Sequence, residues 1–169
     1  PFGSPDMIGG GEYTCFLNGN ENACTPEMFV RYAQIAALMP VMQFSASPWR
    51  VLPEADLQRV KDALALREKC LPDILAAVEC AKSTGEPIAR SMEFVFPGQG
   101  MERVMDQFMV GDELLVAPVW KQGEVSRCVK LPEGQWRCVG FGETEGDVLN
   151  GGQDVVLGEN EGLVVLRRE

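Results

Sequence analysis

The stretch MPVMQFSASPW, from Met39 to Trp49, contains the side chains best suited to bind a ligand. Gln43 and Ser45 alternate with apolar neighbours at a period of two, which places both on one face of an extended segment that Pro48 ends. Uncharged hydrogen-bonding groups beside an aromatic ring suit a sugar, which offers hydroxyls and an apolar C–H face. The spacing therefore indicates the lip of a binding pocket, or alternatively a polar strand end beside a core tryptophan.

Asp6 is a further candidate for contact with a ligand. It lies in PDMIGGG, at the end of an expected strand and just before the glycines at 9–11. Barrels of alternating strands and helices place functional side chains at such strand ends. The alternative is a local role, in which the carboxylate accepts a nearby backbone amide and stabilises the turn. The triple glycine lacks the Gly-Lys-Ser/Thr that a phosphate-binding loop requires.

Other charged residues are predicted to be structural. Asp112 follows Gly111 and suits a turn, and Asp106 is expected to tie a loop to a sheet. Arg31 and Arg90 lie in otherwise apolar segments, so each is expected to have an acidic partner at a buried or interfacial position.

The six cysteines do not form a metal-binding pattern. No two are spaced C-x-x-C, and the chain has no histidine, which argues against a zinc site. Reduced, structural thiols are predicted, with Cys70 and Cys80 in the core, and reduced thiols indicate the cytoplasm. The alternatives are a Cys15–Cys24 disulfide across a loop and a Cys128–Cys138 disulfide across a hairpin.

Composition and charge exclude several classes of protein. The chain has 169 residues, of which 46% are hydrophobic, and a net charge of −10. That charge argues against binding to nucleic acid or to anionic membranes, both of which favour clustered Lys and Arg. No apolar run reaches the roughly 18 residues of a membrane-spanning helix, and no signal peptide opens the chain. The opening PFGSPDM suggests a longer chain that has been cut.

The first half of the chain alternates strands and helices. An expected strand over residues 1–10 is followed by a polar loop over 12–25. Thr25 and Pro26 then mark a helix start, and the strand PVMQFS follows the helix. The next helical pattern covers residues 53–85, and its proline at 72 is expected to kink or divide the helix. Gly85 suits its end. This order is typical of parallel α/β architecture.

The second half predicts an antiparallel β-sandwich. From Pro87 onward, short β-branched or aromatic runs alternate with turn signals such as PGQG and PEGQ. The expected strands are PIARSMEFVF, ELLVAPVW, SRCVKL, QWRCVGF, DVVL and GLVVLRR. The fold class is therefore α/β plus all-β, with a boundary that separates residues 1–86 from residues 87–169.

Several segments together resemble the C-terminal part of glycoside hydrolase family 31, which contains α-glucosidases, α-xylosidases and α-galactosidases. They are PDMIGGG, PEMFVRYAQIAALMPVMQFSASPW, GEPIARSMEFVFP, DQFMVGDELLVAPV and SRCVKLPEGQW. The resemblance is strong to about residue 136. It implies that residues 1–86 are the last two βα units of a (β/α)8 barrel and that residues 87–169 are the β-sandwich that follows it.

The resemblance also implies an activity. The family consists of retaining enzymes that use two carboxylates about 5 Å apart, one as nucleophile and one as acid/base, and that need no metal or organic cofactor. This chain is accordingly expected to be a fragment of an exo-acting α-glycosidase. The segments that carry those carboxylates in the family are absent here. No catalytic residue is therefore assigned, and the missing N-terminal part of the same enzyme is an expected partner.

Substrate contacts carry over residue by residue. Asp6 matches the family's aspartate after the seventh barrel strand, and Arg31 with Tyr32 matches a structural Arg-Trp pair. Ser45 lies where many α-glucosidases of the family have a histidine. The segment MQFSxxPW instead resembles a branch in which some members act on α-galactosides, so an α-galactoside is favoured over an α-glucoside. Gln43, Ser45 and Trp49 are expected at the rim of the sugar pocket.

A protein of another class remains the alternative: a carbohydrate-binding or vestigial β-sandwich module without catalysis. Such a module would protect its sheet edges with charge, proline or a covering element. PFGSPDM and PVMQF are apolar and unprotected instead, which favours an enzyme part that has lost its neighbouring strands.

Overall fold

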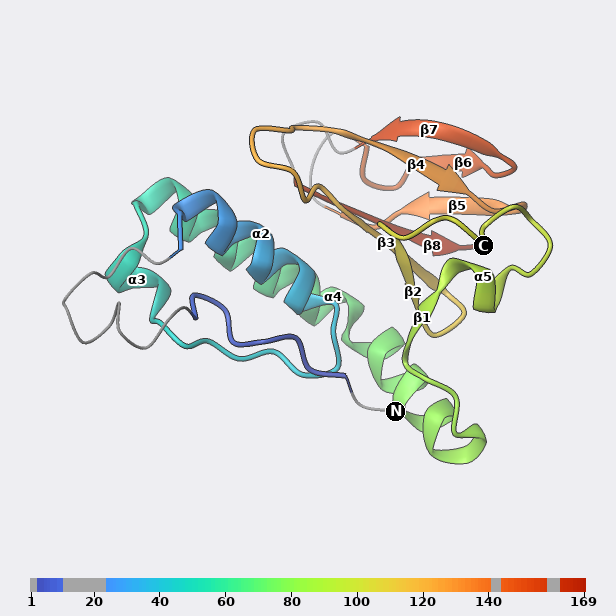
Figure 1. Cartoon of the computed structure of the whole chain (residues 1–169), viewed down its shortest axis with the longest axis horizontal. Coiled ribbons are helices and arrows are strands. Elements are labelled where there is room, and N and C mark those ends of the chain that lie inside the picture. The colour runs from blue at the N-terminus through green and yellow to red at the C-terminus, as the bar shows by residue number, and fades with distance from the viewer. Residues whose placement is uncertain (1–2, 11–23, 141–143, 158–161) are drawn as a thin grey trace.

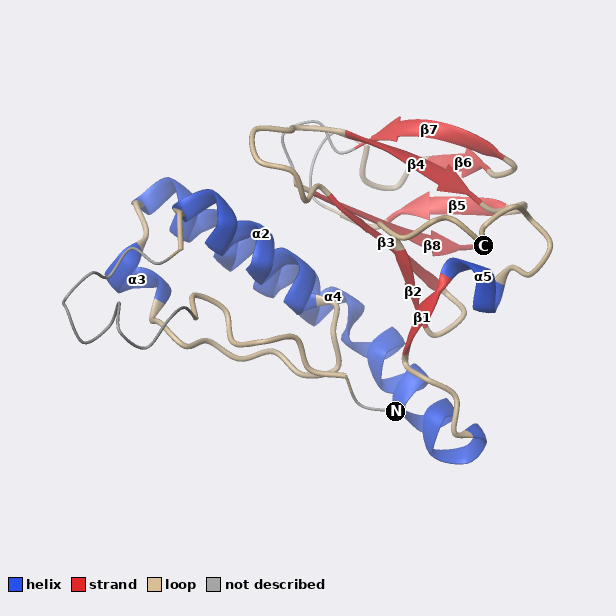
Figure 2. Cartoon of the chain, in the orientation of Figure 1, coloured by secondary structure: helices blue, strands red, loops and turns tan. Residues whose placement is uncertain are grey.

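The structure is a computed structural model that describes residues 3–10, 24–140, 144–157 and 162–169. Helices dominate its first half, and an antiparallel sheet dominates its second half (Figures 1 and 2). The helices are α2 (Pro26–Ala37), α3 (Pro48–Val51), α4 (Glu54–Thr84) and α5 (Met92–Val95). Among the described residues, no helix is long and apolar enough to cross a membrane.

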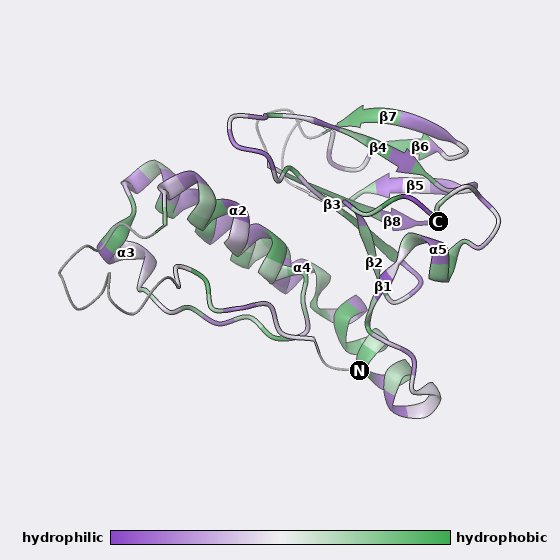
Figure 3. Ribbon diagram, viewed as in Figure 1, coloured by the Kyte–Doolittle hydropathy of each residue, from purple (hydrophilic) through white to green (hydrophobic). Residues whose placement is uncertain are grey.

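Helix α2 begins as its sequence predicts. The Thr25 side chain caps the helix by accepting the Met28 amide at 3.2 Å, and Pro26 occupies the first turn, where its missing N–H removes no hydrogen bond. Phe29, Val30 and other residues of one face are buried against α4 and against the extended segments. Figure 3 shows the resulting alternation of hydrophobic and hydrophilic residues along α2 and α4.

Helix α4 is a single helix of 31 residues that continues through Pro72. The expected division at Pro72 is therefore wrong. A proline removes one main-chain hydrogen bond, but residues of α4 on both sides of it are buried in one cluster with the sheet, among them Leu66, Cys70 and Ile74. The helix ends at Gly85, whose φ of +79° is the left-handed conformation predicted for a C-terminal glycine.

Among the described residues, the second half contains eight strands. They are β1 (Ala89–Ser91), β2 (Phe108–Val110), β3 (Leu114–Pro118), β4 (Arg127–Leu131), β5 (Gln135–Cys138), β6 (Val148–Asn150), β7 (Gln153–Leu157) and β8 (Leu163–Arg168). Six of them form an antiparallel sheet in the order β1-β2-β3-β8-β5-β6, and β4 pairs with β7 in a second sheet. This confirms the predicted antiparallel sheet domain. The run SMEFVF is a correction, because Ser91 caps the short helix α5 there instead of continuing a strand.

Both faces of the larger sheet are covered. Along β3, Leu114 and Val116 belong to the cluster with α4, whereas Leu115 and Ala117 belong to the cluster with β4 and β7. Side chains alternate between the two faces of a strand, so a strand buried on both faces reads as a continuous apolar run. The sheet thus lies between α4 on one side and the two-stranded sheet on the other.

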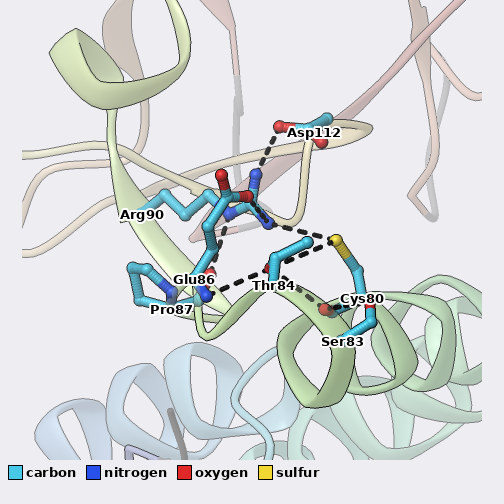
Figure 4. Close-up of polar contacts among 7 residues, drawn as sticks. All are labelled: Cys80, Ser83, Thr84, Glu86, Pro87, Arg90 and Asp112. Carbon is cyan, nitrogen blue, oxygen red and sulfur yellow. Dashed lines mark hydrogen bonds and ion pairs between the residues drawn. The ribbon is translucent and has the colours of Figure 1, made fainter.

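Arg31 and Arg90 each have an acidic partner, as their sequence context predicts. Arg31 pairs with Glu27 on the same helix at 2.6 Å. Arg90, whose side chain is 2% exposed, binds Asp112 at 2.5 Å and Glu86 at 3.2 Å (Figure 4). Its guanidinium also lies 3.8 Å from the Cys80 sulfur. Cys80 is therefore half-buried beside a cation and not in the apolar core, which corrects its prediction.

The remaining structural predictions have mixed outcomes. Asp106 joins its loop to β4 by an ion pair with Arg127 at 3.0 Å, as expected. Cys70 is fully buried. Cys128 is a free thiol on β4, while Cys138 lies on β5 in the other sheet, so the hairpin disulfide is wrong. Cys24 is also a free thiol, and Cys15 lies outside the described residues.

Candidate functional site

Two extended segments, residues 3–10 and 40–47, run side by side below α2 (Figure 1). They meet in a parallel bridge between Ile8 and Phe44. The Ile8 amide donates to the Gln43 carbonyl at 3.0 Å, and the Ser45 amide donates to the Ile8 carbonyl at 2.8 Å. The two strands expected here are thus reduced to one bridge among the described residues. That bridge still brings together the segments that carry Asp6, Gln43 and Ser45.

The bridge determines which side chains face α2. Ile8 is buried, and the Phe44 ring stacks on Phe29 of α2 with centroids 6.2 Å apart. Because side chains alternate along an extended segment, Gln43 and Ser45 point to the opposite face, where both are exposed. The two candidate hydrogen-bonding groups therefore share a face that α2 does not cover.

Gly9 closes this end of the first segment. Its φ is +74°, and a Cβ at this position would lie 2.4 Å from Cε2 of Phe29, so a larger residue would displace the ring. A Cβ on Gly10 would lie 3.9 Å from Cβ of Ser45. The glycines thus let the turn pass close to Phe29 and place it beside Ser45.

Asp6 has an exposed side chain and a fixed backbone. Its carboxylate accepts the Met7 amide at 2.7 Å, which is a local contact of the kind considered as the alternative role. Its carbonyl accepts a hydrogen bond from the Tyr32 hydroxyl. Burial, together with the negative charge of Asp6, raises the pKa of Tyr32, so the hydroxyl keeps its proton and remains a donor. The local contact is compatible with a second role toward a ligand.

Trp49 lies apart from this face, on the four-residue helix α3. Pro48 begins that helix, in addition to ending the extended segment. The Trp49 side chain is 72% exposed, whereas Val51 and Leu52 pack into the cluster with α2. The alternative of a core tryptophan is therefore wrong, and the indole is available to a ligand or a neighbouring segment.

Sequence analysis missed Arg67, which holds the second segment in place. From α4 it donates to the carbonyls of Ala37, Met39 and Pro40 at 2.7, 2.6 and 3.1 Å. These carbonyls lie at the C-terminal end of α2 and just after it, where main-chain carbonyls have no partner within the helix. In sequence, Arg67 looks like any charged residue on a helix surface, and no local signal distinguishes it.

The site as described contains no catalytic pair or metal centre. Among the described residues, no group of three or more His, Cys, Asp or Glu side chains is arranged to hold a metal ion. Asp6 provides one exposed carboxylate on the segment that the bridge joins to Gln43 and Ser45. The arrangement can offer hydrogen-bond acceptors and donors to a polyhydroxylated ligand, which agrees with the chemistry inferred for a sugar.

Residues 85–160 match the family model described as the glycosyl hydrolase family 31 C-terminal domain. The chain belongs to glycoside hydrolase family 31. Its resemblance to that family, predicted from the sequence, is thereby confirmed.

Similar proteins extend the match into the helical half. The mouse myogenesis-regulating glycosidase is 39% identical over 140 residues, which cover 81% of this chain and 20% of that protein. The SITS-binding protein of Tetronarce californica is 36% identical over 138 residues, which cover 79% of this chain and 19% of that protein. Alignments of this length cannot fit within residues 85–169, so they must reach well into residues 1–84. The chain spans about a fifth of the length of these relatives.

Solved structures agree with the family assignment. A family 31 α-xylosidase from a soil metagenome, complexed with xylose, has a TM-score of 0.74 and 29% identity, and the match covers 85% of this chain and 25% of that one. The cycloalternan-degrading enzyme from Trueperella pyogenes has a TM-score of 0.75 and 26% identity, and the match covers 85% of this chain and 22% of that one. Both solved structures thus share the arrangement of most of this chain.

Proposed function

We propose that this chain is part of a retaining, exo-acting α-glycosidase that hydrolyses terminal α-linked sugars. Membership of family 31 supports this, together with similarity to proteins named as a glycosidase, an α-glucosidase and an α-xylosidase. Retaining hydrolysis needs two carboxyl groups about 5 Å apart. We assign both to the portion that precedes residue 1 in the complete enzyme, so residues 1–169 alone are inactive.

In this proposal, residues 1–86 supply the last two βα units of a (β/α)8 barrel, and residues 87–169 form the following β-sandwich. The observation that carries it is the open face of the parallel pair. Met7 and Val41 lie on that face beside Gln43 and Ser45, and both are large apolar residues about 40% exposed. In a closed barrel this face is the interior, where apolar layers lie below a polar rim at the C-terminal ends of the strands.

The proposed substrate contacts are Asp6, Gln43, Ser45 and Trp49. Gln43 and Ser45 meet sugar hydroxyls, Asp6 accepts hydrogen bonds from a hydroxyl of the terminal sugar, and Trp49 forms an apolar wall. Serine at position 45 places a short hydroxyl where many α-glucosidases of the family have an imidazole. On that basis we favour an α-galactoside over an α-glucoside.

The test uses the longest chain encoded by the reading frame that contains residues 1–169, assayed with aryl α-galactoside and aryl α-glucoside. We expect hydrolysis of both, with the larger kcat/KM for the galactoside. Asp6→Ala should lower kcat/KM by about 10- to 150-fold, because a hydrogen bond to a charged group contributes about 1.5–3 kcal/mol. The exposed Asp154 on β7 provides a matched control, and Asp154→Ala should leave kcat/KM unchanged.

Three results would contradict parts of this proposal. Unchanged kinetics in Asp6→Ala would remove Asp6 from the site, and a preference for the glucoside would overturn the sugar assignment. A full-length chain without hydrolytic activity, or without the two upstream carboxylates, would favour the second candidate, a protein that binds carbohydrate without cleaving it. The SITS-binding protein, a relative named for binding and not for hydrolysis, supports a role without catalysis.

A further inference from the structure

A groove of about 410 Å³ runs along the outer face of α2, beside the loop that follows β3. Met28, Tyr32 and Ile35 provide one wall at i, i+4 and i+7, the spacing of a single stripe along a helix. Trp120 and Gln122 provide the other wall. The side chains of Met28 and Trp120 are 57% and 56% exposed, an unusual degree for large apolar residues that lie this close together.

Hydrogen bonds hold the two walls of the groove together. Arg31 on α2 donates to the carbonyl of Val119 and, at 2.6 Å, to that of Glu124. Glu27 accepts the Gly123 amide at 2.8 Å and pairs with Arg31 at 2.6 Å. The loop is therefore fixed to α2, and the groove is formed before anything binds. Because the two charges at its rim neutralise each other, the groove favours an apolar occupant.

The position of the groove within the βα pattern indicates what kind of segment fits. Helix α2 connects the two parallel segments, and α4, which follows the second segment, packs on one side of α2. Successive helices of consecutive βα units lie next to one another, because each crossover has the same hand. The opposite side of α2, which carries the groove, is therefore the place for the helix of a unit that precedes residues 3–10.

We propose that the groove binds an amphipathic α-helix from the part of the protein that precedes residue 1, with apolar residues at helical spacing packed on Met28, Ile35 and Trp120. The inference depends on the proposed function, which makes this chain part of a longer enzyme. It is supported by the length of the relatives, since the matched region is only about 20% of each. None of the other described residues fills the groove.

Occupation of the groove has a consequence for the candidate sugar site. Tyr32 lines the groove, and its hydroxyl donates to the Asp6 carbonyl. A helix packed on the Tyr32 ring restricts the ring and thereby the segment that carries Asp6. Tyr32 is in this sense a positioning residue, because it acts on the substrate only through Asp6.

The test is site-specific photocrosslinking in the longest chain encoded by the reading frame. A p-benzoylphenylalanine replaces Met28, and a matched control replaces Val156, which is 67% exposed on β7. After irradiation, mass spectrometry should identify a crosslink from position 28 to a peptide that precedes residue 1, and no such crosslink from position 156. In support, Met28→Glu should lower the Tm of the full chain by several degrees, whereas Val156→Glu should not.

Each other outcome overturns the proposal. A crosslink from position 28 to residues 11–23, or a covalent dimer with a second copy, would assign the groove to another occupant. The absence of any crosslink would show that no upstream helix lies in the groove. So would a reading frame that adds nothing before residue 1. The crosslink does not depend on activity, so an inactive chain that still crosslinks to the upstream segment would refute the proposed hydrolysis and leave the docking helix in place.

Discussion

The six-stranded sheet and the parallel pair differ in how many of their faces are covered within this chain. In the sheet domain, α4 covers one face of the six-stranded sheet and the β4–β7 pair covers the other. In the helical half, the parallel pair has a single covered face, and α2 has an open groove on its outer side. The difference shows that the six-stranded sheet has both faces covered within this chain, while the parallel pair and α2 present surfaces for further segments.

Two tryptophans express this contrast. Trp136 is fully buried, donates its indole N–H to the Pro132 carbonyl at 2.9 Å, and meets Phe96 edge-to-face. Trp49 contributes to no such cluster and is mostly exposed. The same residue type thus stabilises the fold in one region and is available for binding in the other.

Replacing each of these two tryptophans by alanine should produce the largest difference in the free energy of unfolding between the two regions. Trp136→Ala is expected to lower the free energy of unfolding by about 3–5 kcal/mol, because it leaves a cavity and removes the hydrogen bond from the indole to the Pro132 carbonyl. Trp49→Ala should change it by no more than about 0.5 kcal/mol, as for other surface positions. Urea unfolding followed by circular dichroism measures both. Equal costs for the two variants would contradict the contrast.

Acid should weaken the connection between the two regions. The Gly123 amide and the Arg31 guanidinium both favour the Glu27 carboxylate, which lowers the pKa of Glu27 below its ordinary value of 4.5. A carboxyl group whose pKa is lower in the folded state than in the unfolded state stabilises the fold at pH values above its unfolded-state pKa. This stabilisation is lost as the pH falls through the folded-state pKa. Glu27→Gln should therefore reduce stability at pH 7 and lose its effect in acid well below 4.5.

Thermal melts of the Glu27→Gln variant and the unmodified protein, from pH 7 to well below pH 4.5, measure the loss of this effect. The variant at the exposed Glu102, Glu102→Gln, is the control. A constant difference between Glu27→Gln and the unmodified protein at every pH would show that the carboxylate does not make this contact in solution.

The smallest effect concerns the reactivity of two thiols. Cys128 is exposed on β4, whereas Cys70 lies in the core that α4 shares with the sheet. Burial, with a contribution from Asp73, raises the pKa of Cys70 to about 11. At pH 8 only roughly one molecule in a thousand then carries the Cys70 thiolate, the reactive form.

Iodoacetamide at pH 8 should therefore label Cys128 quickly and Cys70 only after unfolding. Peptide mass spectrometry measures each site, and Cys128→Ser provides the control for specificity. Rapid labelling of Cys70 in the folded protein would mean that α4 separates readily from the sheet.

Local signals in the sequence predicted many individual elements. The Thr25–Pro26 helix start and the glycine stop at 85 depend on hydrogen bonds and φ angles within one turn, so neighbouring residues suffice to specify them. The division expected at Pro72 was wrong because burial along the whole of α4 outweighs one missing hydrogen bond. Ser91 was missed as a helix cap because it lies within a run of strand-forming residues.

The candidate site was only partly predictable. Period-two alternation indicated that Gln43 and Ser45 share a face, and the structure places both on the side away from α2. No local pattern indicated that Arg67 holds three carbonyls or that the Tyr32 hydroxyl reaches Asp6. The walls of the groove likewise come from residues far apart in the chain.

Neighbouring residues and ordered motifs suffice to predict the helix boundaries at Thr25 and Gly85, the antiparallel second half and the family. Three other features emerge only from the folded chain: the pairing of Ile8 with Phe44, the core that α4 shares with the sheet, and the placement of Cys128 and Cys138 in different sheets. Such contacts join segments far apart in the chain. They depend on the packing of the whole molecule, which short-range preferences do not encode.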